Sequence, residues 1–274
     1  MHTHRRKIWK EILIFTVLCL GISTPLWYLA YSNQEADYAV FCVMLASFLP
    51  AVLTLVITKI TKEGWDNLGI AFNLKKSWKI YLLSMFGTTL LPYLADPLML
   101  LLFPENVTTT FTPMELINIV IVMLIGTACF IECLGEELGW IGYLFPRLEK
   151  VLGTMPACVA LGVIRATWHI GILVMMDYPV YGFIELLLSN VFLQSFMVYM
   201  FKKSGSLFPC TISHGISNLM PIFLVYDSSW YYTSILPMVV CLIPVVVYGV
   251  LAYLGMKKAN LLCKKVVTGT TGVK

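Results

Sequence analysis

Charge is scarce in this chain of 274 residues, because only 12% of the residues are charged while 59% are hydrophobic. A soluble domain contains about 25% charged and roughly 45–50% apolar residues. A soluble α/β enzyme, a nucleic-acid-binding protein and a disordered chain are therefore excluded, because each would leave this apolar surface in water. The composition predicts an all-α polytopic membrane protein instead.

Several metal, redox and linker patterns are also missing. The chain has no C-x-x-C pair, no H-E-x-x-H helix, no low-complexity linker and no detectable internal repeat. Its eight cysteines lie mostly within apolar runs and are interpreted as small buried hydrophobic residues. The absence of a linker predicts a single membrane domain over residues 1–274.

The apolar runs give the number of expected helices. A helix needs about 20 apolar residues to cross the hydrocarbon core of a bilayer. The sequence predicts a transmembrane helical bundle of about eight spans, near 12–31, 38–58, 80–103, 114–134, 151–176, 181–201, 207–226 and 232–256. The first run has no small-residue cleavage site, so we interpret it as an uncleaved anchor rather than a secretory signal.

Lysine and arginine are absent from the loops on one side of these eight spans. All but one of the 19 basic residues fall at the termini or in the loops of the other side, and the exception, Arg165, lies inside the fifth span. The positive-inside rule then predicts that both termini are cytoplasmic. The expected location is integral and multi-pass in a membrane, which would be the plasma membrane if the source is bacterial.

Polar side chains inside the spans are the functional signal. Such residues are costly in hydrocarbon and usually face a bundle interior where they pair or act. Three spans each carry two polar residues four positions apart, which places both on one helix face: Glu132 and Glu136, Arg165 and His169, His214 and Asn218. We expect the three faces to converge on a polar chamber, because unpaired charges in a dry bundle are expensive.

Three local motifs strengthen this interpretation. The run GEELGWIGYLFPRL at 135–148 resembles the first signature of the CAAX protease and bacteriocin-processing (CPBP or Abi) family of intramembrane proteases. Trp168-His169 resembles the second signature. Gly205-Ser-Leu-Phe-Pro209, followed by His214-x-x-x-Asn218, resembles the third. The motif-bearing core covers about 126–220.

Two positions depart from that family's pattern. The first motif usually has an arginine four residues after its second glutamate, where this chain has Ile141. The second usually has an aromatic residue four before its histidine, where this chain has Arg165. We therefore expect that the cation has moved across the helix interface, with Arg165 as a supporting residue.

The resemblance implies roles for five residues in peptide hydrolysis. Glu136 would activate water, and His169 would position it or shuttle its proton. His214 and Asn218 would direct donors at the oxyanion, while Glu137 would support the network. No cofactor is expected on this interpretation. Zn²⁺ stays open as an alternative, because two histidines and two glutamates can bind zinc and the family carries a metalloprotease label.

The resulting hypothesis is an intramembrane endopeptidase of the CAAX-protease type. Its expected partners are membrane lipid and a peptide or protein substrate with a membrane-associated segment, and no nucleic acid. The alternatives are a non-proteolytic family member, such as an immunity or scaffold factor, and a proton-coupled transporter. Asp96, Glu132, Glu185 and Asn190 are expected to be structural or pore-lining. Gly135, Gly139 and Gly142 could form a close helix-packing face.

Overall fold

The computed structural model describes residues 2–32, 34–128, 130–175 and 180–263. Four helices are long and apolar enough to cross a membrane: α1 (His2–Ser32), α2 (Asp37–Thr61), α10 (Val180–Ser204) and α13 (Leu236–Lys258). A fifth joins them if the bent pair formed by α6 and the helix after it is one span. The all-α membrane fold predicted from composition is confirmed, and the count of eight spans stays a prediction.

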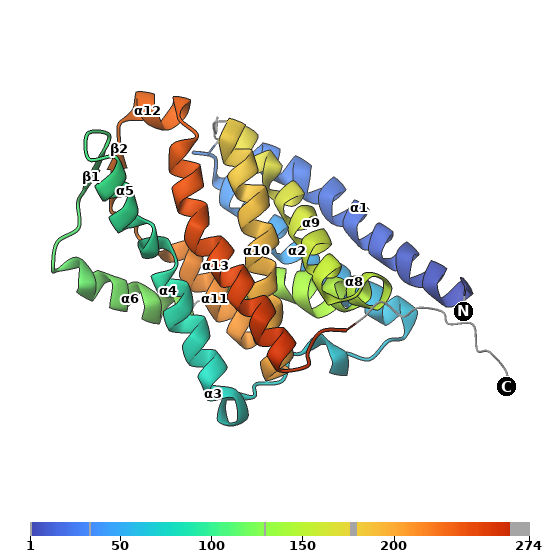
Figure 1. Ribbon diagram of the computed structural model, residues 1–274. Coiled ribbons are helices and arrows are strands. Elements are labelled where there is room, and N and C mark those ends of the chain that lie inside the picture. Colours follow the sequence, from blue (N-terminus) through green and yellow to red (C-terminus); the bar gives the residue numbers. More distant parts are fainter. Residues whose placement is uncertain (1, 33, 129, 176–179, 264–274) are drawn as a thin grey trace.

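The remaining elements are shorter. They are η1 (Asp66–Leu68), α3 (Leu74–Leu82), η2 (Leu83–Gly87), α4 (Thr88–Leu90), η3 (Pro92–Leu94), α5 (Asp96–Leu102), β1 (Val107–Thr109), α6 (Glu115–Ala128), α7 (Phe130–Glu137), η4 (Leu138–Leu144), α8 (Phe145–Leu152), α9 (Thr154–Met175), α11 (Phe208–Leu219), β2 (Leu224–Tyr226) and α12 (Ser228–Thr233). Helix α10 packs between α9 and α13, and α1 packs against α2 and α9 (Figure 1).

The third predicted span, 80–103, is not one continuous helix. It is divided into α3, η2, α4, η3 and α5. Pro92 and Pro97 stand in the first turns of η3 and α5, respectively. Proline has no backbone N–H and clashes with the preceding turn, which favours a break or a new helix start there, although α1, α2 and α13 continue through Pro25, Pro50 and Pro244. An estimate based on hydropathy alone overlooks such breaks.

The seventh predicted span, 207–226, is helical only in its first part. Helix α11 has 12 residues and ends at Leu219, and Met220 is extended. Pro221 follows, and the residue before a proline is disfavoured in the helical conformation. The chain continues into β2, which pairs antiparallel with β1 in the register Val107↔Tyr226. This two-stranded sheet is a feature that the sequence did not predict.

Three glycines allow close approach to the segment that carries the first motif. A Cβ at Gly139 would lie 2.3 Å from the Cβ of Pro50, and one at Gly135 would lie 2.9 Å from the Phe48 ring. At Gly142 it would meet the carbonyl oxygen of Leu68 at 2.9 Å. The predicted glycine packing face is therefore present, mainly against α2.

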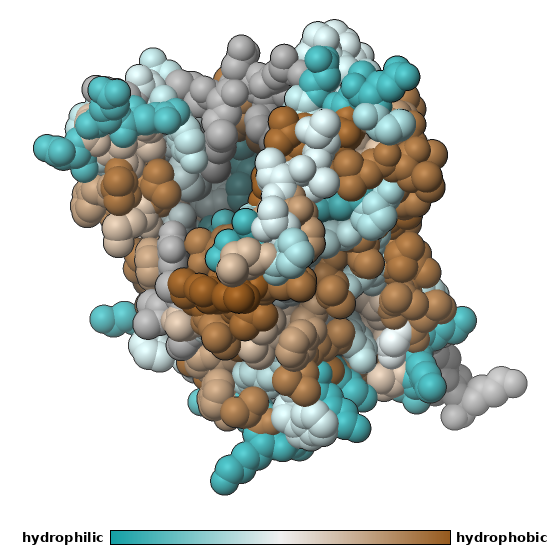
Figure 2. Space-filling view, turned by 90° about the vertical axis from the view of Figure 1, so that its left-hand side faces the viewer, coloured by the Kyte–Doolittle hydropathy of each residue, from teal (hydrophilic) through white to brown (hydrophobic). Residues whose placement is uncertain are grey.

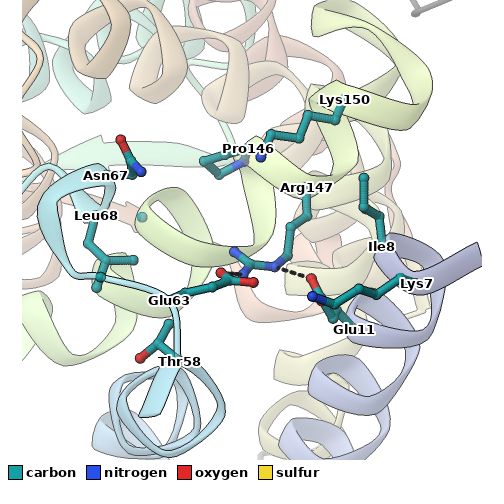
Figure 3. A pocket seen from close by; sticks show the side chains of 12 residues that line it. Lys7, Ile8, Glu11, Thr58, Glu63, Asn67, Leu68, Pro146, Arg147 and Lys150 are labelled. Carbon is teal, nitrogen blue, oxygen red and sulfur yellow. Dashed lines mark hydrogen bonds and ion pairs between the residues drawn. The ribbon is translucent and has the colours of Figure 1, made fainter. Parts of the chain in front are cut away.

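One end of the bundle is tied together by Arg147 of α8. Its Nε donates to Glu11 Oε2 of α1 at 3.0 Å, and Nη2 forms an ion pair with Glu63, just beyond α2 (Figure 3). The guanidinium also lies over the Tyr143 ring and donates to the Tyr143 carbonyl oxygen. A pocket of about 320 Å³ opens beside this ion pair and is flanked by Lys7 and Lys150.

Both ends of the described chain reach this same end of the bundle. Glu11 near the start contacts Arg147, and Cys263 accepts a backbone hydrogen bond from Thr154 through its carbonyl oxygen. The sheet and α12 lie at the opposite end (Figure 1). Figure 2 shows a broad hydrophobic band between hydrophilic residues at the two ends. Lys264, Lys265 and Lys274, which belong to the predicted pattern of basic residues, lie outside the described residues.

Candidate active site

The two adjacent glutamates lie where an α-helix changes into a π-helix. Helix α7 ends at Glu137, and the π-helical segment η4 follows directly. Every residue of η4 is buried. π-Helical segments are rare, and they occur frequently at functional sites. Both carboxylates, at the last two positions of α7, lie in the interior of the bundle.

Arg165 of α9 lies against both carboxylates. Its Nη2 is 2.8 Å from Glu137 Oε1 and 3.2 Å from Glu136 Oε2. All three residues are buried, with exposed fractions of 5%, 0% and 7% for Arg165, Glu137 and Glu136. Buried charges are retained only when they are paired. The guanidinium therefore compensates the charge of the glutamate pair from across the helix interface.

His214 of α11 completes a cluster drawn from three helices. Its Nδ1 lies 2.9 Å from Glu137 Oε1 and 3.1 Å from Arg165 Nη2. Its Nε2 lies 4.0 Å from Glu136 Oε2. Helices α7, α9 and α11 thus bring two carboxylates, a guanidinium and an imidazole into mutual contact.

His169 stands one turn after Arg165 and is oriented by it. Its Nδ1 lies 2.8 Å from the Arg165 carbonyl oxygen. A carbonyl oxygen only accepts, so Nδ1 donates the hydrogen and Nε2 is the acceptor nitrogen of the neutral ring. His169 lines the cavity described below. Within the part of the chain that the structure describes, no hydrogen bond joins it to Glu136 or His214.

Asn218 lies one turn after His214, as the spacing predicted, but at the rim rather than in the cluster. It is exposed, and its Nδ2 lies 3.8 Å from Cys133 Sγ of α7. Helix α11 itself is held closely against α6, because a Cβ at Gly126 would lie 2.8 Å from the Ile216 Cα. The side chain of Glu132 lies outside the described residues.

A cavity of about 220 Å³ opens beside the cluster, with room for several water molecules. Four of the predicted residues line it: Arg165, His169, His214 and Asn218. Glu136 and Glu137 do not line it, because they lie behind Arg165. A second cavity of about 530 Å³ shares Thr88, Leu91, Leu186 and Ser217 with the first. Asp96 and Glu185 line this second cavity, whereas Asn190 lines the first.

The donor set does not fit a zinc ion. Among the described residues, no group of three His, Cys, Asp or Glu side chains is arranged to hold a metal. Arg165 occupies the place between Glu136, Glu137 and His214, and a second cation there would be repelled by the guanidinium. No step of the chemistry below passes through a metal.

Four polar residues of this cavity were not anticipated from the sequence: Thr88, Gln194, Ser213 and Ser217. Gln194 of α10 lines the cavity together with His169 and is 2% exposed. It follows Asn190 by four positions, so the same spacing rule that joined Arg165 to His169 would have identified it.

The comparison with known families covers this same region. Residues 118–220 match the family model of type II CAAX prenyl endopeptidase Rce1-like proteins. This range contains all three motifs, and it confirms the resemblance to the CAAX protease family. No curated protein matches the chain. The match supports an intramembrane protease, and the apolar helices support an integral membrane location.

Proposed function

We propose that this protein is an intramembrane endopeptidase that hydrolyses a peptide bond of a membrane-associated peptide or protein. The observation that carries the proposal is the convergence of Glu136, Glu137, Arg165 and His214 beside a polar cavity. These residues lie in the segment that matches an endopeptidase family. Hydrolysis needs a base for water, donors for the oxyanion and an acid for the leaving amine, and these groups supply each role.

In the proposed reaction Glu136 is the general base. Arg165 holds Oε2 of Glu136, and within the described residues no ion pair or hydrogen bond reaches Oε1. Oε1 takes a proton from water while the water oxygen attacks the substrate carbonyl carbon. His169 accepts the second hydrogen of that water at Nε2 and so orients it. Glu136 then returns its proton to the amide nitrogen as the C–N bond breaks.

The oxyanion is stabilised from the α11 side of the cavity. Asn218 supplies an amide donor, and His214 supplies a ring nitrogen from one turn earlier. Arg165 lies between Glu136 and the cavity, so its guanidinium must shift for water to reach the carboxylate. Catalytic contacts commonly tighten only in the substrate complex.

One observation favours a second candidate, a non-proteolytic family member that acts as an immunity or scaffold factor. Arg165 contacts both carboxylates and separates Glu136 from the cavity. In a protein without catalysis, this closed ion-pair cluster would be purely structural. The two candidates differ in whether the biological effect requires the Glu136 carboxylate.

The proposed substrate is a peptide or protein with a membrane-associated segment, and membrane lipid is the surrounding partner. No nucleic-acid partner is proposed. In a bacterial source the membrane would be the plasma membrane. A true substrate can be recognised experimentally, because its cleavage fragments should appear only when the Glu136 carboxylate is present.

The test is peptide mass analysis of cells that lack the protein, or that carry the wild type, Glu136→Gln or the control Glu115→Gln. Glu115 is on α6, where it accepts a hydrogen bond from Asn118, away from the site. A protease gives new peptide termini with the wild type and with Glu115→Gln only. Identical peptides in all four samples, together with a phenotype that Glu136→Gln retains, would establish the scaffold candidate instead.

A further inference from the structure

Gln194 is a buried amide without a partner in the wall of the candidate active site. It lies on α10, is 2% exposed, and lines the cavity that Arg165, His169 and His214 also line. Its Oε1 atom is buried and has no hydrogen-bond partner among the described residues. No hydrogen bond of its Nε2 is formed with the described part of the chain either.

Asn190, one turn earlier on the same helix, shows that side-chain amides on α10 do not in general lack hydrogen-bond partners. Asn190 Nδ2 donates to the Leu186 carbonyl oxygen at 2.9 Å, so its own helix satisfies it. Gln194 has a longer side chain and makes no such bond. A buried amide that is left unpaired destabilises the fold, so its presence beside the cavity points to a partner that arrives from the cavity.

The chemistry of an amide restricts what this partner can be. A glutamine side chain offers one acceptor oxygen and two N–H donors. The matching groups are the backbone N–H and C=O of one residue in an extended segment, which point to the same side of the chain. That N–H donates to Oε1, and that carbonyl oxygen accepts from Nε2. The same cavity is lined by His214 and Asn218, which the proposed reaction assigns to the carbonyl that is attacked.

We propose that Gln194 is a substrate-binding residue that hydrogen-bonds the backbone N–H and C=O of one residue next to the scissile bond. The inference rests on the proposed protease function. It also defines the substrate, because peptide groups inside an α-helix already bond to one another. Only a locally unwound, extended segment has a free N–H and C=O for Gln194. Recognition is therefore of backbone, and it tolerates different side chains.

The test uses the full-length protein in lipid vesicles with a peptide that it cleaves, and compares the wild type with Gln194→Met. Methionine keeps the length and apolar volume of the side chain but has no amide. We expect KM to rise about five- to a hundredfold with little change in kcat, the usual effect of two lost neutral hydrogen bonds. The matched control is Asn118→Leu on α6, which changes an amide that donates to Glu115 and does not line the cavity, and it should leave KM unchanged.

A second readout identifies the bond itself. A peptide series carries one N-methyl group at each position within three residues of the scissile bond, which removes a single N–H. One of these methyl groups should weaken the wild type but add nothing to Gln194→Met. Additive effects at every position would overturn the proposal. The thermal unfolding midpoint gives the remaining control, because Gln194→Met should leave it unchanged or raise it, whereas a structural partner would lower it.

Failure of the protease proposal is measured separately. Binding of the same peptides is determined on the Glu136→Gln background, where no cleavage is needed. If the wild type cleaves no peptide but Gln194→Met still weakens binding of the unmethylated peptide, the protease proposal fails and the binding role holds. If Gln194→Met binds all peptides as tightly as its parent, the binding role is wrong.

Discussion

Arg165 Nη2 lies 2.8 Å from Glu137 Oε1, although the two residues come from different helices. The motif that this chain resembles supplies an arginine from the same helix as the glutamates, four residues after the second one. Ile141 occupies that position here and is completely buried. The cation next to the glutamates of this protein therefore comes from α9, one turn before His169.

We predict that Arg165→Leu is inactive and destabilised by about 3–5 kcal/mol, because it leaves two buried carboxylates without their cation. Adding Ile141→Arg should recover part of the loss, since the new arginine returns a cation to the same carboxylate pair. Chemical denaturation and peptide cleavage of the four proteins in the double-mutant cycle measure the coupling. Strict additivity would show that the two positions do not exchange the cation.

Replacement of Glu136 by glutamine should reduce hydrolysis by at least about 10²-fold, the usual contribution of a general base. Stability should change little, because Glu137 remains to pair with Arg165 and the glutamine keeps the side-chain volume. Initial cleavage rates and unfolding midpoints give the two quantities. Wild-type rates in the variant would exclude Glu136 as the base and favour the scaffold candidate.

The convergence of polar helix faces was predictable because spacing of four residues is a property of the helix itself. The residues that depart from the family pattern, Ile141 and Arg165, also pointed to a relocated cation. Spacing does not reveal which of the converging side chains line the cavity and which do not. Glu136 was expected to face the chamber, but it does not line the cavity, whereas its partner Arg165 does.

Hydropathy also does not reveal where an apolar run stops being a helix. The runs at 80–103 and 207–226 contain Pro92, Pro97 and Pro221, and the backbone breaks at each of them. The short sheet between β1 and β2 depends on residues more than a hundred positions apart, which no local pattern encodes. Gln194 was overlooked although it follows Asn190 by four positions, because an uncharged polar residue stands out less in an apolar span than a charged one.

Asn218 tests the oxyanion role and the metal question together. We expect Asn218→Ala to lower kcat by about 10²–10³-fold, while chelators leave the wild type active. Cys133→Ala is the matched control, because it removes only the sulfur that Asn218 contacts and should have a small effect. Stoichiometric zinc in an active preparation, with activity lost on its removal and restored on its return, would establish a metalloenzyme.

The distribution of lysine and arginine predicts sidedness. Single cysteines at positions 76 and 34, placed on a Cys263→Ser background because Cys263 is exposed, should react with a membrane-impermeant thiol reagent from opposite sides. Position 76 is expected to be cytoplasmic and position 34 external. Labelling of both from the same side in intact cells would refute the predicted arrangement of spans.

The guanidinium of Arg147 forms one ion pair with a largely buried carboxylate, Glu11, and one with a more exposed carboxylate, Glu63. Side-chain exposure is 10% for Arg147 and 11% for Glu11, but 37% for Glu63. We therefore predict that Arg147→Leu costs about 3 kcal/mol of unfolding free energy, because it leaves the largely buried Glu11 carboxylate with only the more exposed Lys7 as a partner, at 3.7 Å. Glu63→Gln should cost less than about 1 kcal/mol, since water screens the more exposed pair. Denaturation of both variants in one detergent gives the comparison, and Arg147→Leu, Glu11→Gln should be closer to wild type than Arg147→Leu alone. If Arg147→Leu and Glu63→Gln lowered the unfolding free energy equally, the Arg147–Glu11 ion pair between α8 and α1 would add no stability beyond that of the Arg147–Glu63 pair.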